Sequence, residues 1–295
     1  MRRIGSGGFG TICLVKEKQS GKLMARKEMN YDTLKEIDMV NCEVRIIREI
    51  NEFFRSSSLQ SSYIYVIEPL GFFVDEEECK AFLIMEYCEG GDLHQYIEEM
   101  KKSRSWISEE DAWSTISQLV FAIHQLHNHR IIHGDLKPQN VLLTKDRKIK
   151  LGDFGLARKL QNIATYATAN GFTWRYLAPE LLITPTSQQN SKGLKIQELL
   201  KQKIELRLSS DIWALGIILF ELLAQHHPFM DQDEELPLLE NFKRITENEP
   251  KPLPLQYPEN MRKLILMMLV KDPHQRITIN EIMQIPEIIA CLAKK

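Results

Sequence analysis

The sequence predicts an α+β protein in which a small β-rich N-terminal part, containing one main helix, precedes a larger and mostly helical C-terminal part. Two observations lead to this prediction. Short runs of β-branched and apolar residues, separated by turn residues, occupy most of the first 85 residues. Helical spacing of apolar residues, three and four apart, occurs once in that part and then recurs after residue 108.

Composition and charge describe a folded protein with no strong attraction for polyanions. The chain has 295 residues and a formal net charge of −2, and its pI is about 6.5. With so little net charge, neither nucleic acid nor an anionic membrane is indicated as a partner. The length allows one large domain or two small ones, and either can bury a sizeable core.

The cysteines and the apolar segments indicate the compartment. The five cysteines are scattered and include no C-x-x-C pair, which predicts free thiols rather than a disulfide framework or a zinc site. The N-terminus lacks the apolar core of a signal peptide. The most apolar long stretch, residues 214–224, is too short to span a bilayer. We therefore expect a soluble protein of the cytoplasm or nucleus.

A glycine-rich run near the N-terminus predicts a loop folded over phosphates. Backbone amides can approach phosphate oxygens only where no Cβ intervenes, and residues 11–15 and 23–27 have the pattern of strands. A dinucleotide-binding fold uses the same spacing but requires a helix directly after it, which is not indicated here. An ordinary glycine-rich hairpin is the alternative when the run is taken alone. The run is Gly5, Ser6, Gly7, Gly8, Phe9 and Gly10, with Phe9 at the loop tip.

The one helix of the β-rich part is predicted over residues 33–54. Glu43 lies beside its apolar stripe, so this carboxylate can face a neighbouring strand. Glu36 and Glu49 are competing carboxylates on the same helix. The stripe consists of Leu34, Ile37, Val40, Val44 and Ile47.

The chain is organised around two short polar segments, residues 133–140 and 153–155. They place the carboxylate of Asp135, the ammonium of Lys137, the amide of Asn140 and the carboxylate of Asp153 within about two dozen positions. Apolar residues 141–143 and 149–151, with a polar turn between them, predict a hairpin that joins the two segments. Such groups can orient a hydroxyl and hold a magnesium-bound triphosphate, because magnesium prefers oxygen ligands.

These residues resemble the motifs of the eukaryotic protein kinases, whose catalytic loop reads H-R-D-x-x-x-x-N and whose metal loop reads D-F-G. The resemblance extends from Gly5 to Arg276. It implies a two-lobed kinase fold with an N-lobe over residues 1–85, a hinge over 86–91 and a C-lobe over 92–295. The hinge sequence also resembles, weakly, that of the NIMA-related subfamily.

The resemblance implies ATP and Mg²⁺ as cofactors and assigns roles to the polar residues. Asp135 would accept the proton of the attacking hydroxyl and orient it, and Lys137 would neutralise charge on the γ-phosphoryl group. Asn140 and Asp153 would hold two magnesium ions. Lys27 would contact the α- and β-phosphates and pair with Glu43.

Further residues follow from the same resemblance. The nucleotide contacts would include the glycine run, together with Ile12, Ala25, Met85, Glu86, Cys88, Asp92 and Leu142. The supporting residues would be His133, Phe154, Gly155, Thr173, Glu180, Asp211 and Arg276. Thr173 and the pair Lys137-Pro138 favour serine or threonine hydroxyls of proteins as acceptors.

Gly134 departs from the family pattern, because it stands where an arginine is expected. Many family members pair that guanidinium with a phosphorylated activation loop. Either the enzyme is active without loop phosphorylation, or the chain is a pseudokinase scaffold that binds partners or nucleotide without turnover. We expect the first, since each group assigned to ATP or metal is retained, and Thr165 and Thr168 should then be dispensable.

Three other segments remain outside these assignments. Residues 55–62 are serine-rich and predict a loop insertion. Residues 184–208 form a second insertion, with a loop over 184–191 and an amphipathic helix over 194–206. His124, His127 and His129 lie close together, and we interpret them as a polar helix end in preference to a metal site.

Overall fold

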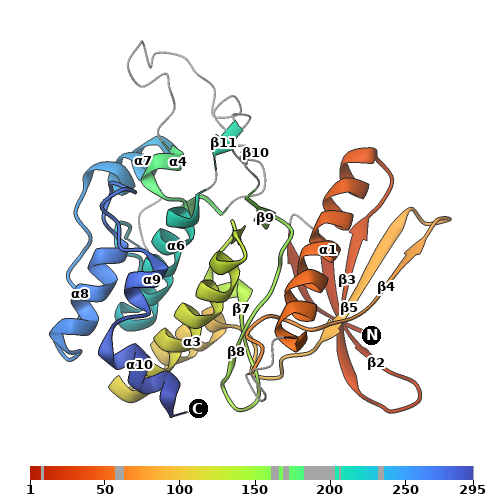
Figure 1. Ribbon diagram of the computed structural model, residues 1–295, viewed down its shortest axis with the longest axis horizontal. Helices are drawn as coiled ribbons and strands as arrows, with labels where there is room; N and C mark the ends of the chain where they lie inside the picture. The colour runs from red at the N-terminus through yellow and green to blue at the C-terminus, as the bar shows by residue number, and fades with distance from the viewer. Residues whose placement is uncertain are drawn as a thin grey trace. The chain divides into compact units, whose positions relative to one another are not determined.

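The chain divides into two compact units, each described here by itself. The computed structural model describes residues 1–7, 10–56, 63–160, 166–168, 173–182, 203–205, 207–231 and 236–294 (Figure 1). The first unit consists of Met1–Gly91 and Leu142–Ala157, and the second of Asp92–Val141 and Arg158–Lys295. Residues 142–157, which the sequence prediction assigned to the C-lobe, thus contact the first unit most. The lobe boundaries stay a prediction.

The first unit contains an antiparallel five-stranded sheet with the strand order β1-β2-β3-β5-β4. The expected helix is α1 (Leu34–Ser56), which packs on β3 and β4 through the buried side chains of Val40, Val44 and Ile47 (Figure 1). The backbone of the first strand stays paired with β2 up to Gly7. The strands are β1 (Arg2–Gly7), β2 (Gly10–Lys16), β3 (Leu23–Asn30), β4 (Pro69–Asp75) and β5 (Lys80–Glu86).

The predicted hairpin between the two polar segments is confirmed. Its strands are β7 (Val141–Leu143) and β8 (Ile149–Leu151). The segment before β4 runs alongside β8, since Leu151 donates its N–H to the carbonyl of Tyr65 at 2.7 Å and accepts from Ile67 at 2.9 Å. Asp153 therefore follows a strand that is hydrogen-bonded on both sides.

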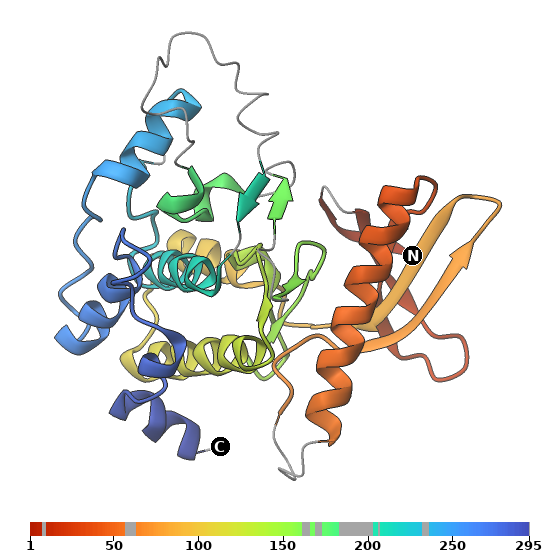
Figure 2. The same ribbon diagram turned by 45° about the horizontal axis from the view of Figure 1, so that its top comes forward.

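The second unit is mostly helical. Figure 2 shows α3 (Glu109–Asn128) and α6 (Leu208–Ala224) running alongside each other, and α10 (Pro286–Ala293) also packs on α3. Nearly every residue of α6 is buried, so this helix forms the centre of the unit's core. The other helices are α2 (Leu93–Lys102), α4 (Pro179–Leu182), α7 (Leu238–Glu247), α8 (Glu259–Met268) and α9 (Ile279–Ile282).

Local sequence explains where several of these helices begin. Ser108 accepts the N–H of Asp111 at 3.1 Å and caps α3, directly before an acidic first turn. Asp92 caps α2 in the same way, accepting the N–H of Gln95 at 2.8 Å. Within the described part of the chain, no helix has the length and apolar character required to cross a membrane.

Short elements connect the helices around the polar segment at residues 133–140. β6 (Ile131–Ile132) pairs with β9 (Arg158–Lys159), and the turn of 3₁₀ helix η1 (Pro138–Asn140) follows β6. A second 3₁₀ turn, η2 (Trp174–Tyr176), precedes α4. These elements hold the catalytic-loop residues between β6 and β7.

The second insertion differs from its predicted structure where it is described. β11 (Lys203–Glu205) is a strand that pairs antiparallel with β10 (Tyr166–Thr168), so the predicted helix over 194–206 is wrong for these three residues. Backbone pairing with a segment far away in sequence overrides the local helical period. The first insertion was predicted as a loop over 55–62, but its first two residues, Arg55 and Ser56, belong to α1 because the helix continues to that point. Residues 57–62, residues 183–202 and Thr165 lie outside the described residues.

Candidate active site

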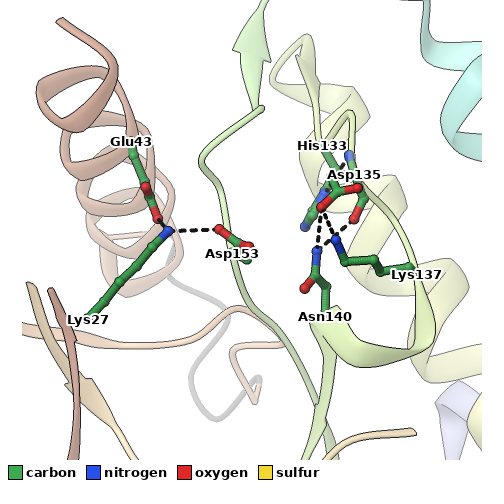
Figure 3. Close-up of polar contacts among 7 residues, drawn as sticks. All are labelled: Lys27, Glu43, His133, Asp135, Lys137, Asn140 and Asp153. Carbon is green, nitrogen blue, oxygen red and sulfur yellow. Dashed lines mark hydrogen bonds and ion pairs between the residues drawn. The ribbon is translucent and has the colours of Figure 1, made fainter. Parts of the chain in front are cut away.

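Lys27 is the centre of a buried ion cluster in the first unit. Its Nζ lies 2.6 Å from Glu43 Oε1 and 2.8 Å from Asp153 Oδ1 (Figure 3). Of the three carboxylates considered on α1, Glu43 is thus the one in contact with Lys27. Burial by itself would lower the pKa of Lys27, but the charges of Glu43 and Asp153 outweigh burial and raise it. The ammonium therefore stays charged and shared between two carboxylates.

The backbone around Asp153 places its carboxylate in this cluster. Asp153 has a left-handed conformation, with φ at 56°, directly after β8. Phe154 is completely buried beside it. Left-handed backbone costs a non-glycine residue on the order of 1 kcal/mol, so the surrounding packing must hold Asp153 in place. Gly155 belongs to the turn that follows.

Both ends of the glycine run belong to strands of the first unit's sheet, β1 and β2. Gly10 has φ at 136°, and a Cβ there would lie 2.1 Å from the carbonyl oxygen of Glu28. Only glycine can therefore hold β2 this close to β3. Gly5 lies in β1, as do Ser6 and Gly7, whose backbone alone is described, while Gly8 and Phe9 fall in the gap at residues 8–9.

The expected adenine contacts all belong to the first unit. Ala25 faces Met85 across the β3–β5 ladder, and both side chains are buried. Ile12 is in register with Lys27 on the neighbouring strand. The hinge ends against β7, since Gly90 donates its N–H to Leu143 O at 2.8 Å. Leu142 is the preceding residue and is half-buried.

The hinge residues differ in what they contact. Glu86 ends β5, and Cys88 is buried. Burial, together with the charge of Glu86, raises the pKa of the Cys88 thiol to about 12, although Lys150 opposes this shift. Cys88 is therefore an un-ionised thiol at neutral pH. Asp92, the first residue of the second unit, caps α2 rather than facing open solvent, and burial raises the pKa of its carboxyl.

The catalytic-loop residues form a cluster of their own in the second unit. Lys137 Nζ donates to Asp135 Oδ2 at 2.5 Å and to Thr173 Oγ1 at 3.0 Å. Asn140 Nδ2 donates to the backbone carbonyl of Asp135 at 2.8 Å and to its carboxylate at 3.1 Å (Figure 3). The Asp135 side chain is only 4% exposed. The four residues therefore fix one buried carboxylate and one ammonium next to each other.

Asp211, on α6, holds the backbone of this loop through hydrogen bonds. It accepts the backbone N–H of His133 at 2.9 Å and that of Gly134 at 3.1 Å. His127 Nε2 lies 3.0 Å from the same carboxylate. One of the three neighbouring histidines thus has an acidic partner 84 residues away, which spacing along the helix could not reveal.

Glu180 and Arg276 form a bidentate pair in the second unit. Arg276 Nη1 and Nη2 each lie 2.8 Å from one oxygen of Glu180. The same guanidinium donates to the carbonyls of Val270, Ser209 and Lys271 at 2.8–3.1 Å. The Arg276 side chain is fully buried, so the pair connects α4 to the core of the unit.

Two polar contacts near the loop were missed by sequence reasoning. Tyr176 donates its hydroxyl to Glu221 Oε2 at 2.9 Å, and burial raises the pKa of Glu221 to about 7. His227 Nε2 lies 3.0 Å from the carbonyl of Arg175, and Phe229 donates its N–H to Nδ1 at 3.2 Å. The sequence contains one indication that Glu221 is unusual, because it is the one charged residue in the apolar stretch 214–224.

The residues present fit the chemistry of magnesium-bound nucleotide. Carboxylate and amide oxygens are the ligands that magnesium prefers, and Asp153 in the first unit and Asn140 in the second provide one each. Both contacts of Asn140 to Asp135 use its nitrogen, so the amide oxygen is the atom suited to a cation. Lys27 adds an ammonium suited to phosphate oxygens.

Comparisons with known proteins agree with this chemistry. The family model described as "Protein kinase domain" matches residues 1–287. The probable serine/threonine-protein kinase nek2 of Dictyostelium discoideum is 31% identical over 286 residues, which cover 95% of this chain and 60% of that protein. The serine/threonine-protein kinase Nek2 of Mus musculus is 30% identical over 302 residues, which cover 100% of this chain and 60% of that protein.

A fungal relative is similar over much of the chain. The G2-specific protein kinase nimA of Emericella nidulans is 30% identical over 309 residues, covering 94% of this chain and 39% of that protein. The chain therefore spans about 60% or less of the length of these three relatives.

Proposed function

This chain belongs to the protein kinase family, and from that premise we propose that it transfers the γ-phosphate of Mg-ATP to serine or threonine hydroxyls of proteins. The observation that carries this proposal is the cluster of Asp135, Lys137, Asn140 and Thr173 in the second unit. A buried carboxylate held next to an ammonium is the arrangement that phosphoryl transfer to a hydroxyl requires.

Asp135 has the position and surroundings of the residue that orients the acceptor. Its carboxylate would accept the hydroxyl proton, while Lys137 would offset negative charge on the phosphoryl oxygens. Lys137 already donates a hydrogen bond to the Thr173 hydroxyl, which fixes the position of the ammonium. This contact supports serine and threonine as acceptors, and the named relatives that are similar to this chain are serine/threonine kinases.

The first unit supplies the nucleotide contacts in this proposal. Lys27, held by Glu43, would bind phosphate oxygens, and Asp153 would be an oxygen ligand of magnesium. Asn140 would be an oxygen ligand of magnesium from the second unit. Magnesium-bound ATP supplies the transferred group and charge neutralisation, and the chain's residues position them.

The glycine at position 134 is what supports activity without loop phosphorylation in this proposal. Gly134 has φ at 78°, a region that glycine enters without the cost borne by other residues. A residue with a Cβ would be strained at this position, and the polar contacts of Asp135, Lys137 and Asn140 in the same loop are formed with glycine here. A phosphate on the activation segment would lack the guanidinium that it pairs with in many family members.

The deciding experiment compares wild-type protein with Asp153→Asn in ATP-dependent phosphorylation of a generic protein substrate. We expect phosphate on serine and threonine for wild type and a loss of at least a hundredfold for the variant, on the order of 3 kcal/mol of transition-state stabilisation. Nucleotide binding is measured in parallel. Equal inactivity of both proteins, with nucleotide still bound, would establish the scaffold alternative instead.

A further inference from the structure

A buried ion pair in the first unit connects the hinge with the strand that leads to Asp153. Lys150 Nζ, on β8, lies 2.7 Å from Glu86 Oε1, at the end of β5. The side chains are 9% and 22% exposed. The same Glu86 oxygen accepts the N–H of Glu68 at 2.8 Å, and Glu86 donates its own N–H to Glu68 O at 3.0 Å. One ammonium thus contacts the residue at which the hinge begins.

An aromatic ring covers this ammonium. Lys150 Nζ lies 4.8 Å from the ring centre of Tyr63, which packs edge-on against Tyr65 at 4.9 Å. The exposed Lys148 contacts the same ring at 5.1 Å. Tyr63 is the first described residue after the serine-rich insertion, and the backbone of this segment is paired with Leu151. The ring excludes water from one side of the ion pair and strengthens it.

The positions of the two charges make this contact relevant to nucleotide binding. Lys150 precedes Asp153 by three residues, and Glu86 precedes Cys88 by two. Both charges act on the hinge, since Glu86 raises the pKa of the Cys88 thiol and Lys150 lowers it. Removing Lys150 would leave a largely buried carboxylate without its cation, and an uncompensated buried charge is destabilising. The side-chain contact that joins the end of β5 to β8 would be lost with it.

We propose that Lys150 is a positioning residue for nucleotide binding, which fixes the hinge backbone against β8 through its ion pair with Glu86 beside the Tyr63 ring. This inference rests on the proposed function, because it takes residues 86–91 as the adenine-binding segment. The effect of Lys150 is on affinity for nucleotide, through Glu86.

The test uses the full chain and compares Lys150→Met with Lys148→Met. Both variants lose a cation against Tyr63, but only the first loses the contact with Glu86, so Lys148→Met is a matched control. The Kd of a fluorescent ATP analogue with magnesium is measured by titration. We expect a rise of about tenfold for Lys150→Met, equivalent to about 1.4 kcal/mol, and less than twofold for Lys148→Met.

Three further measurements separate positioning from general destabilisation. KM for ATP should rise with Kd while kcat at saturating ATP changes less than twofold. Lys150→Arg should recover most of the affinity. The double variant Glu86→Gln with Lys150→Met should bind more tightly than Lys150→Met alone, because no uncompensated charge remains. If Lys150→Met does not fold, the double variant is compared with Glu86→Gln: the two Kd values should differ less than twofold, because Lys150 acts through the Glu86 carboxylate, and a tenfold difference contradicts the proposal.

Equal Kd values for Lys150→Met and Lys148→Met would overturn the inference, as would a wild-type protein that binds no nucleotide. A wild type that binds nucleotide but transfers no phosphate would disprove the proposed function alone. In that case the Kd comparison still decides the role of Lys150.

Discussion

Gly134 donates its backbone N–H to Asp211 Oδ1 over 3.1 Å, and it does so from a left-handed conformation with φ at 78°. The preceding N–H, that of His133, binds the other oxygen of the same carboxylate at 2.9 Å. Two consecutive amides can converge on one carboxylate because the chain turns sharply at this point. Gly134 therefore has a conformational role in the catalytic loop, beyond the loss of a guanidinium.

Replacing Gly134 by alanine should lower the stability of the protein. A Cβ in the left-handed region costs roughly 1–2 kcal/mol, and the loss should appear as a lower Tm in thermal unfolding. Gly71→Ala is the control, because a Cβ at Gly71 would meet Ile84 at an ordinary 3.9 Å. An equal decrease in Tm for the two variants would show that the conformation at 134 has no special cost.

Thr173 and Thr168 should respond differently to substitution. Thr173→Val removes the hydroxyl that accepts from Lys137 at 3.0 Å, so we expect kcat to fall at least tenfold, about 1.4 kcal/mol. Thr168→Ala and Thr165→Ala should leave kcat nearly unchanged, because Gly134 offers no cation to a phosphate on this segment. Steady-state rates on a generic substrate measure all three. A large loss at Thr168 would contradict activity without loop phosphorylation.

Sequence alone predicted the elements whose pattern is local. The apolar stripe of α1 predicted the buried side of the helix at Val40, Val44 and Ile47, although Leu34 at its start is exposed. The stripe left Glu36 and Glu49 as competitors of Glu43, and the contact with Lys27 distinguishes them. The hairpin of β7 and β8 followed from two apolar runs around a polar turn. In both cases the pattern lies within about two dozen consecutive residues, and the spacing of the apolar side chains indicates a helix or a strand.

Contacts between distant segments could not be read in this way. A helical period shows which face of α3 is buried, but it does not show that His127 meets Asp211 on another helix. The strand at Lys203–Glu205 depends on a partner near Ala167, so local periodicity favoured a helix there. Lys150 and Glu86 each resemble an ordinary surface charge until the backbone brings them within 2.7 Å.

Arg276→Lys should destabilise the second unit strongly, although charge is conserved. The guanidinium of Arg276 donates to Glu180 and to three backbone carbonyls, and a lysine has only three donors on one atom. Buried carbonyls would lose partners, which costs about 1–3 kcal/mol each. Chemical denaturation of the variant measures the loss. Arg244→Lys, on an exposed pair with Asp231 at 3.5 Å, is the control and should change stability little.

Glu221 should make the protein less stable as the pH rises from about 4.5 to about 7. Burial raises the pKa of Glu221 to about 7 in the folded chain from 4.5, although the Tyr176 hydrogen bond opposes the shift. Between these values the folded state binds a proton that the unfolded state has released, so increasing pH favours unfolding. The difference corresponds to roughly 3 kcal/mol over the window.

Glu221→Gln isolates this contribution, because glutamine can still accept the Tyr176 hydroxyl but does not titrate. His227 contributes with the opposite sign in an overlapping pH range, since burial lowers its pKa from 6.5 to about 3. Both proteins retain His227, so its effect cancels in the comparison. Stability of wild type and Glu221→Gln is measured by denaturation from pH 4.5 to 8. The variant should gain stability relative to wild type as the pH rises through this range, and a constant difference would show that Glu221 has the same pKa in the folded and unfolded protein.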